Sequence, residues 1–370
     1  MEMLPQLLHS LVAFIIIISV IVFVHEFGHY WVARRCGVRV ETFSIGFGQE
    51  LFGWNDKHGT RWKVSLFPLG GYVKMFGDSS AASTPDGEKL KKMTAKEKKE
   101  AFHYKKLSQK AAIVAAGPIA NFLFSMLLLS FFFVAYGRPE TSPEISEVAK
   151  GSAAEAAGLQ KGDVIVTLGG QNIVRFEDLR SMASMHPGEK LEVSFMRHGK
   201  LVNGSVTPKL TESTDIFGNK VKVGLLGVGS SAVNYKPMGF AKAVPAGIAE
   251  VYNISKNTLD AVGQMIIGKR SAGELSGVLR IGQYSGQAAD KGIAVVLWFM
   301  AVLSVNLGLI NLFPIPVLDG GHLVFYAIEA VKGRPLAERA QEFGYRIGFS
   351  LLILLMVFAT YNDLRHLNIL

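Results

Sequence analysis

Cysteine is nearly absent from this sequence, since Cys36 is the single one among 370 residues. The chain can therefore form no internal disulfide, and any domain outside the cytoplasm must depend on its own hydrophobic core. Cys36 also lacks the partner that a cysteine-based metal site needs, so we interpret it as chemically inert.

Acidic residues are scarce relative to basic ones: 30 Asp and Glu stand against 39 Lys and Arg, a net charge of +9. The sequence has no motif typical of nucleic-acid binding, so we attribute the excess to membrane topology and contact with lipid. A hydrophobic content of 49% and a mean hydropathy of +0.28 predict a membrane part plus one or two small soluble domains. An inverted repeat is also missing, which argues against a metal transporter.

Charged residues are missing from the first apolar run, Leu11 to Val24, which only Ser19 interrupts. No small-x-small cleavage site follows it, so we expect a membrane-spanning helix over residues 1–33 rather than a cleaved signal peptide. Three further spans are predicted at 109–137, 292–322 and 345–370. The fold class is thus a polytopic α-helical membrane protein with four transmembrane helices.

Lysine and arginine gather in two of the connections, 34–108 and 323–344. The positive-inside rule places both in the cytoplasm, and both termini then lie on the outer, periplasmic side. Within the first connection, residues 40–75 alternate between apolar and polar types around an Asn55–Gly59 turn. We predict a β-hairpin or small sheet at the membrane surface, which either packs as a plain hairpin or offers an edge to an extended peptide.

A polar motif closes the first apolar run: His25, Glu26 and His29. Ionisable groups at such a position are costly and therefore indicate function. Residues i and i+4 share one helix face, so both imidazoles can reach one metal ion. This H-E-x-x-H spacing is typical of zinc hydrolases, in which the glutamate acts as general base on a water molecule.

A third ligand is needed, because a catalytic zinc uses three protein ligands and one open position. The third span ends in an irregular Pro-x-Pro segment, and backbone of this kind at membrane depth is tolerated when it lines a cavity. Asp319 and His322 are the candidates, and the residue pattern does not choose between them. Asn121, in the second span, either bonds to a neighbouring helix or faces the site.

The stretch from residue 138 to 215 has the strand-like runs and turns of a soluble α+β domain. A helix of small residues, a Gly-Leu turn and a Gly-Asp pair, Gly151 to Ile165, resemble a bacterial PDZ domain. Such a domain takes an extended peptide as an added strand, or here it covers the membrane site as a bulky plug. Residues 216–291 are expected to form a periplasmic amphipathic helix, over about 241–267, and an irregular linker, over about 271–290.

The motif around His25, the Gly117-Pro118 pair with Asn121, and the segment from Asn311 to Gly320 together resemble the site-2 protease family of intramembrane metalloproteases. The basic run after Trp31, residues 68–75 and the region after Ile281 are similar to bacterial members that act on anti-sigma factors. Enterobacterial members carry two tandem PDZ domains, whereas this chain has room for one.

This resemblance implies a zinc metalloendopeptidase of regulated intramembrane proteolysis, in the inner membrane of a bacterial cell. It implies that His25, His29 and Asp319 bind Zn²⁺, that Glu26 is the general base and that Asn311 holds the substrate or the developing oxyanion. Substrate binding is assigned to Asn306, Pro314 and Pro316. The implied partners are single-span membrane proteins such as an anti-sigma factor, signal-peptide remnants and the lipid bilayer, with no nucleic acid. The alternative is a proteolytically inactive PDZ scaffold with a structural zinc, in which His322 would be a fourth ligand.

Overall fold

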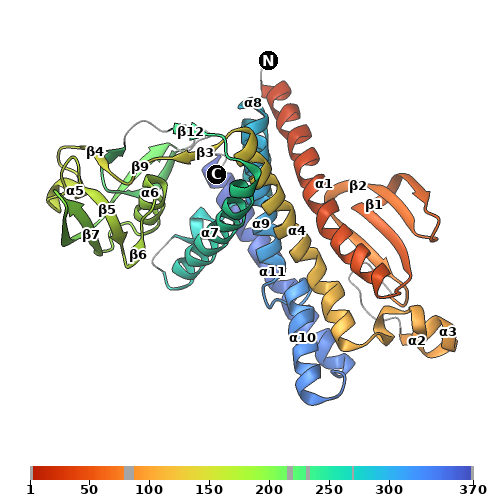
Figure 1. Cartoon of the computed structure of the whole chain (residues 1–370). Helices are drawn as coiled ribbons and strands as arrows, with labels where there is room; N and C mark the ends of the chain where they lie inside the picture. Colours follow the sequence, from red (N-terminus) through yellow and green to blue (C-terminus); the bar gives the residue numbers. More distant parts are fainter. Residues whose placement is uncertain (1–2, 79–86, 215–219, 231–233, 269–270, 368–370) are drawn as a thin grey trace. The chain divides into compact units, whose positions relative to one another are not determined.

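The computed structural model describes residues 3–78, 87–214, 220–230, 234–268 and 271–367 (Figure 1). It divides into two compact units. We call Met1–Phe132 with Ala243–Leu370 the helical unit, and Phe133–Lys242 the α+β unit. Parts of the predicted 216–291 linker and of the C-terminal tail lie outside the described residues.

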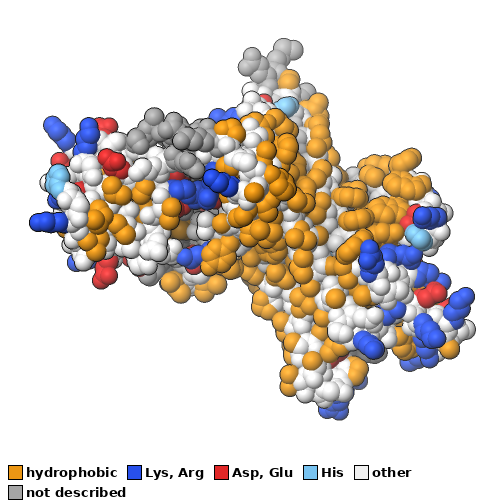
Figure 2. All heavy atoms as spheres, viewed as in Figure 1, with side chains coloured by type: hydrophobic (Ala, Val, Ile, Leu, Met, Phe, Trp, Pro, Cys, Tyr) orange, Lys and Arg blue, Asp and Glu red, His pale blue; other side chains and the backbone are white. Residues whose placement is uncertain are grey.

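Long apolar helices dominate the helical unit: α1 (Met3–Arg35), α4 (Leu107–Ala135), α9 (Ile293–Asn311) and α11 (Glu338–His366). Within the described part of the chain, these four are long and apolar enough to cross a membrane. They expose many large apolar side chains, which cover the helix faces in Figure 2. Such surface is stable against lipid and not against water, so the predicted multi-pass membrane architecture is confirmed.

Helix α1 ends sharply just beyond the His25–His29 motif. Gly37 adopts a left-handed φ of 69°, which is costly for residues with a side chain. Its N–H donates to the Arg34 carbonyl, and the Val38 N–H donates to the Ala33 carbonyl. This pair of hydrogen bonds forms a Schellman motif, and it turns the chain directly from α1 into the first strand.

Strands β1 (Val40–Asn55) and β2 (Arg61–Met75) confirm the predicted hairpin. The sheet is more curled than a simple hairpin, because residues 42–45 pair with 71–74 on one side and with 61–64 on the other. Residues 52–55 then pair with 61–64. Residues 71–75 therefore form an outer edge of the sheet, and no other described strand pairs with this edge.

A shared hydrophobic core fixes this sheet against the ends of two spans. It joins buried side chains from α1, from both strands and from the start of α4. Phe43 and Ile113 are almost completely buried in it. Burial of each side chain of this size contributes about 1.5–3 kcal/mol, so the sheet has a fixed position beside α1.

Further helices complete the helical unit. They are α2 (Gly87–Lys92), α3 (Ala95–Glu100), η1 (Phe102–Tyr104), α7 (Phe240–Ile266), η2 (Ala272–Glu274), α8 (Val278–Asp290) and α10 (Asp319–Lys332). Helix α7 matches the predicted amphipathic helix. Helix α10 lies in a stretch for which the sequence predicted a span end and a loop.

The prediction of an irregular linker up to residue 290 is wrong from Val278 onward, where α8 begins. The N-terminus of α8 has no local side-chain cap. Asp363, from α11, instead accepts hydrogen bonds from the N–H groups of Gly277 (2.8 Å), Leu279 (3.0 Å) and Arg280 (3.1 Å). A partner more than 80 residues away thus stabilises a Gly-rich segment as helix.

The α+β unit has a four-stranded antiparallel sheet in the order β6-β5-β7-β8, with α5 and α6 packed on one continuous core. Its elements are β3 (Arg138–Glu140), β4 (Ile145–Val148), α5 (Ala153–Ala156), β5 (Val164–Leu168), β6 (Gln171–Asn172), α6 (Phe176–Met185), β7 (Leu191–Arg197), β8 (Lys200–Val206), β9 (Lys209–Thr214), β10 (Lys220–Leu225), β11 (Val228–Ser230) and β12 (Asn234–Lys236). Strand β11 pairs with β4, and Leu226 is buried in the core. The folded unit therefore continues beyond residue 215.

Candidate functional site

Two glycines allow α1 and α4 to approach each other closely at the polar motif. A side chain on Gly28 would overlap the Ala116 carbonyl, and one on Gly117 would overlap the His29 imidazole and crowd that of His25. The Gly117-Pro118 pair noted in the sequence therefore has a steric role. It leaves room for two imidazoles between helices that are in backbone contact.

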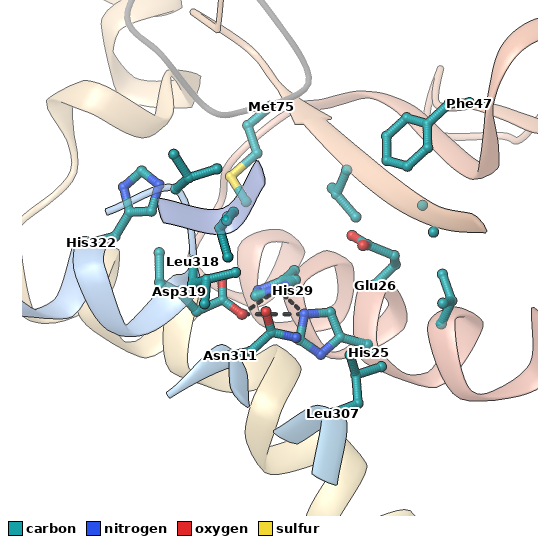
Figure 3. Close-up of a pocket in the computed structure, with 17 residues that line it drawn as sticks. His25, Glu26, His29, Phe47, Met75, Leu307, Asn311, Leu318, Asp319 and His322 are labelled. Atoms are coloured by element: carbon teal, nitrogen blue, oxygen red, sulfur yellow. Dashed lines mark hydrogen bonds and ion pairs between the residues drawn. The ribbon is translucent and has the colours of Figure 1, made fainter. Parts of the chain in front are cut away.

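His25, His29 and Asp319 form the one cluster of potential metal ligands found in the described part of the chain. The two Nε2 atoms lie 3.2 Å apart. Oδ2 of Asp319 lies 3.2 Å from Nε2 of His25 and 3.5 Å from Nε2 of His29. Figure 3 shows the carboxylate and both rings pointing toward one another. Two helices 290 residues apart in the sequence thus meet at one point.

These distances fit a tetrahedral metal ion. Zinc bonds to nitrogen or oxygen of about 2.0–2.1 Å place neighbouring donor atoms roughly 3.3–3.4 Å apart in a tetrahedron. The hydrogen bonding fits as well: Nδ1 of His29 lies 2.9 Å from the Ile113 carbonyl, which can only accept. The proton of neutral His29 is therefore on Nδ1, and its Nε2 lone pair faces the cluster.

Two buried atoms of this region have no hydrogen-bond partner, Oδ2 of Asp319 and Oδ1 of Asn121. A buried acceptor without a partner costs about 1–3 kcal/mol, so such atoms require an explanation. For Asp319 a cation bound between the carboxylate and the two imidazoles provides it. The donor set of two nitrogens and one oxygen suits zinc.

A cavity of about 550 Å³ opens beside the cluster. Glu26 and Asn311 line it together with the three potential ligands. In Figure 3 the Glu26 carboxylate lies on the β-sheet side of the imidazoles, and Asn311 lies close to Asp319. Further lining comes from the sheet, from neighbouring helices and from the turn before α10: Val22, Phe47, Gly70, Gly71, Val73, Met75, Val114, Leu307, Val317, Leu318, His322 and Leu352.

The predicted substrate-binding residues do not line this cavity. Oδ1 of Asn306 accepts a hydrogen bond of 3.0 Å from the Thr258 hydroxyl, on α7. Pro316 lies against the backbone of Gly348, on α11. Pro316 therefore packs against α11. The assignment of Asn306, Pro314 and Pro316 to substrate binding stays a prediction.

The cavity wall includes two residues that the sequence did not single out for this role, Val317 and His322. Val317 has φ of 91°, which is strained for a β-branched residue, and it directly precedes Leu318 and Asp319. His322 lies apart from the ligand cluster in Figure 3, with Nδ1 3.4 Å from the Tyr345 hydroxyl. No pattern of residue types signals a positive φ at a valine.

One carboxylate ties the sheet to α1 next to the site. Asp56, in the β1–β2 turn, accepts hydrogen bonds from the Tyr30 hydroxyl, the Trp62 indole and the backbone N–H groups of His58 and Thr60. Partial burial opposes ionisation of Asp56, but these donors outweigh it and hold its pKa below the usual value. Tyr30 directly follows His29, so this contact fixes the turn beside the ligand helix.

Comparison with known proteins places these observations in a family. The model of "Peptidase family M50" matches residues 13–355. The chain is 46% identical to "Putative zinc metalloprotease Atu1380" of Agrobacterium fabrum over 361 residues. The aligned stretch covers 96% of this chain and 96% of the relative. It is 38% identical to metalloprotease MmpA of Caulobacter vibrioides, over 97% of this chain and 96% of the relative.

The regulator of sigma E protease of Salmonella typhi is 33% identical, over 98% of this chain and 100% of the relative. The predicted resemblance to site-2 proteases is thus confirmed, as are the predictions of a peptidase and of zinc as its cofactor. The chain belongs to peptidase family M50.

Proposed function

We propose that this protein is an intramembrane zinc metalloprotease that cleaves membrane-anchored proteins within or near their transmembrane segment. The observation that carries the proposal is the convergence of His25, His29 and Asp319 at mutual distances of 3.2–3.5 Å beside Glu26. The three ligands and the base share one cavity at the end of an apolar helix. Each of these residue types has a separate task in peptide hydrolysis.

Zinc held by these residues supplies Lewis-acid chemistry, which polarises a peptide carbonyl and makes water acidic enough to attack it. Glu26 takes the proton of the attacking water on its carboxylate and later delivers a proton to the leaving amine. The Asn311 amide lines the same cavity and can donate a hydrogen bond to the substrate carbonyl oxygen as charge develops there. His25 and His29 stay neutral, and their Nε2 atoms offer lone pairs to the metal.

A structural zinc in an inactive scaffold is less consistent with this geometry. Such sites fill all four positions with protein ligands. The cluster holds three potential ligands among the described residues, and His322 is not part of it. Glu26 would also have no task in a structural site. The fourth position is therefore assigned to water and substrate.

The outer strand of the sheet provides a place for an unwound substrate. Its residues Gly71, Val73 and Met75 line the cavity, and no other described strand pairs with this edge. A helical substrate hides its carbonyls in hydrogen bonds, so it must become extended before cleavage. Pairing with residues 71–75 would replace the lost helix bonds and hold the peptide beside Glu26.

The same proposal assigns a bacterial inner-membrane location, with connections 34–108 and 323–344 in the cytoplasm and both termini in the periplasm. The distribution of lysine and arginine supports this orientation. The α+β unit is assigned as a single periplasmic PDZ domain, supported by its strand and helix order around Gly151–Ile165. It would admit substrates whose outer domain has already been removed.

The proposed substrates are single-span proteins such as an anti-sigma factor, together with signal-peptide remnants, in regulated intramembrane proteolysis. A relative named regulator of sigma E protease supports this class. Both kinds of substrate present one apolar membrane-spanning helix. Such a helix is compatible with the apolar surroundings of the cavity.

The test is a cleavage assay with the full-length protein and a single-span substrate in lipid vesicles. Glu26→Gln removes the base and keeps the shape of the side chain, so we expect cleavage to fall by at least about 100-fold. Zinc content, measured on the same preparation, should stay at one ion per chain. Glu342→Gln, an exposed position on α11, is the matched control and should cleave as the unaltered protein does.

Normal cleavage by Glu26→Gln would contradict the proposal, whatever its zinc content. Loss of zinc together with cleavage would show that Glu26 supports the metal site instead of acting as the base.

A further inference from the structure

Asn121, on α4, is completely buried next to the ligand cluster. Its amide Nδ2 lies 3.1 Å from Nδ1 of His25, and its Oδ1 has no hydrogen-bond partner. The sequence left open whether this side chain bonds to a neighbouring helix or faces the site. The structure shows it against the imidazole of a potential ligand, on the side away from the metal position.

The position of the cluster decides which nitrogen of His25 carries the proton. Nε2 of His25 lies 3.2 Å from both Nε2 of His29 and Oδ2 of Asp319, so it is the atom that can bind a cation. A ligand nitrogen must offer its lone pair, and the proton of the neutral ring is then on Nδ1. Nδ1–H requires an acceptor, whereas the Nδ2 group of an amide is a donor.

Rotation of the Asn121 amide by 180° resolves this conflict. Oδ1 then takes the place of Nδ2, 3.1 Å from Nδ1 of His25, and the buried acceptor without a partner gains one. We propose that Asn121 is a positioning residue of the metal site: its Oδ1 accepts the Nδ1–H of His25 and fixes the ring with Nε2 toward zinc. This corresponds to the contact of His29 with the Ile113 carbonyl.

The backbone carbonyl of Asn121 links its own helix, α4, to α9. Its carbonyl accepts hydrogen bonds from the hydroxyls of Ser125, at 2.9 Å, and of Ser304, at 3.1 Å. Ser304 belongs to α9, the helix that leads to Asp319, whereas His25 belongs to α1. Asn121 therefore connects both segments that supply ligands, through its carbonyl on one side and its amide on the other.

This inference rests on the proposed zinc site, so its test measures zinc binding and not cleavage. Full-length protein in detergent is stripped of metal and titrated with zinc against a competing chelator of known affinity. Loss of a hydrogen-bond partner behind a metal-bound histidine weakens metal binding about 10–100-fold. We expect this loss for Asn121→Leu, whose side chain branches at the same carbon and has no acceptor.

Asn121→Asp distinguishes the two orientations of the amide. A carboxylate can only accept, so it replaces Oδ1 and forms the carboxylate–histidine–zinc arrangement common in zinc proteins. Zinc affinity close to that of the unaltered protein is expected. If Asn121 instead donated to an unprotonated Nδ1, aspartate would lose the contact, and Asn121→Asp would bind zinc as weakly as Asn121→Leu.

Two serine variants control for packing. Ser304→Ala removes one bond to the Asn121 backbone and leaves the amide, so its loss of affinity should be clearly smaller than that of Asn121→Leu. Ser285→Ala removes an equally buried hydroxyl that bonds within α8, and it should leave zinc affinity unchanged. Should Asn121→Leu fail to fold, Asn121→Asp decides alone.

The inference is overturned if Asn121→Leu binds zinc normally, if Asn121→Asp binds it poorly, or if Ser304→Ala loses as much affinity as Asn121→Leu. An unaltered protein that binds no zinc would refute the metal site itself, and the inference with it. These results are distinguishable, because the first three require a functional zinc site in the unaltered protein.

Discussion

The two units bury carboxylates in opposite ways. In the α+β unit, Asp163 accepts hydrogen bonds from Nε and Nη2 of Arg197, at 2.8 and 2.7 Å, and from the Gln160 N–H at 2.7 Å. In the helical unit, Oδ2 of Asp319 has no hydrogen-bond partner and faces two imidazole nitrogens. Both carboxylates are largely enclosed by protein.

This difference separates a structural polar group from a ligand. A network in which every donor and acceptor is paired stabilises its unit and leaves nothing for another molecule. Acceptors that converge without donors are unstable by themselves and require a cation. Substitution of one kind of carboxylate can therefore be judged against substitution of the other.

The largest effect is expected for Asp319→Ala. It removes one of three ligands, so zinc affinity should fall by more than the roughly 10–100-fold typical for loss of an outer partner. Asp163→Ala should leave zinc affinity unchanged. Competitive titration with a chelator measures both variants, and equal zinc affinities for the two would remove the distinction between the carboxylates.

Gly117→Ala comes next, because its methyl group would overlap the His29 imidazole. Overpacking of this kind costs about 1–3 kcal/mol, and displacement of the ring should weaken zinc binding as well. Gly282→Ala, on α8, is the control, since a methyl group there meets no atom within 4 Å. It should stabilise the helix by about 0.5–1 kcal/mol and leave zinc binding intact. Thermal unfolding measures the change in stability, and zinc titration measures the change in zinc affinity.

Asp163→Ala should destabilise the α+β unit by about 2 kcal/mol, since it removes the charge-assisted hydrogen bonds from Arg197 and the bond from the Gln160 N–H to this buried carboxylate. Hydrogen exchange of strand β7 is the appropriate measurement, because it reports on this unit alone. Exchange should become roughly 30-fold faster at neutral pH. Unchanged exchange in β7, or faster exchange in α1, would contradict the assignment of Asp163 to local stability.

The contribution of Asp163 should also depend on pH. Burial opposes its ionisation, but the bonds from Arg197 and from the Gln160 N–H outweigh burial and lower its pKa. A lowered folded-state pKa means that the stabilisation is complete above the unfolded-state value of about 3.9 and is lost as pH falls through the folded-state value. The difference between Asp163→Ala and the unaltered protein should therefore shrink only below about pH 4. A difference that already disappears at pH 6 would exclude this carboxylate as its source.

Tyr30→Phe should have the smallest effect. It removes one of the four hydrogen bonds to Asp56, which costs about 1 kcal/mol, and it leaves the ligands in place. Faster hydrogen exchange in the β1–β2 turn with normal zinc affinity is expected. A loss of zinc would show that the position of the sheet controls the ligand helix.

The part of the site on α1 could be predicted from the sequence because it lies on one regular helix. His25, Glu26 and His29 need only the period of 3.6 residues to share a face. Helix periodicity does not predict the position of Asp319, because Asp319 follows an irregular segment in which Val317 has a positive φ. The residue types did not decide whether Asp319 or His322 is the third metal ligand, and the family resemblance favoured Asp319. The structure places Asp319 in the cluster and His322 outside it.

Features that depend on distant partners could not be predicted. Helix α8 has a Gly-rich start and needs Asp363 of α11 as its cap. The α+β unit continues past residue 215 because β11 pairs with β4. The His29 contact with the Ile113 carbonyl has no signal in the sequence, since every residue has a carbonyl. Asn121 did carry a signal, an amide in an apolar helix, but only the structure shows what it touches.

Zinc K-edge X-ray absorption of the full-length protein tests the central claim most directly. The account predicts one zinc per chain with only nitrogen and oxygen neighbours at about 2.0–2.1 Å, two of them imidazoles, and an unchanged spectrum in His322→Ala. A third imidazole that disappears in His322→Ala, or a sulfur neighbour at about 2.3 Å, would contradict it.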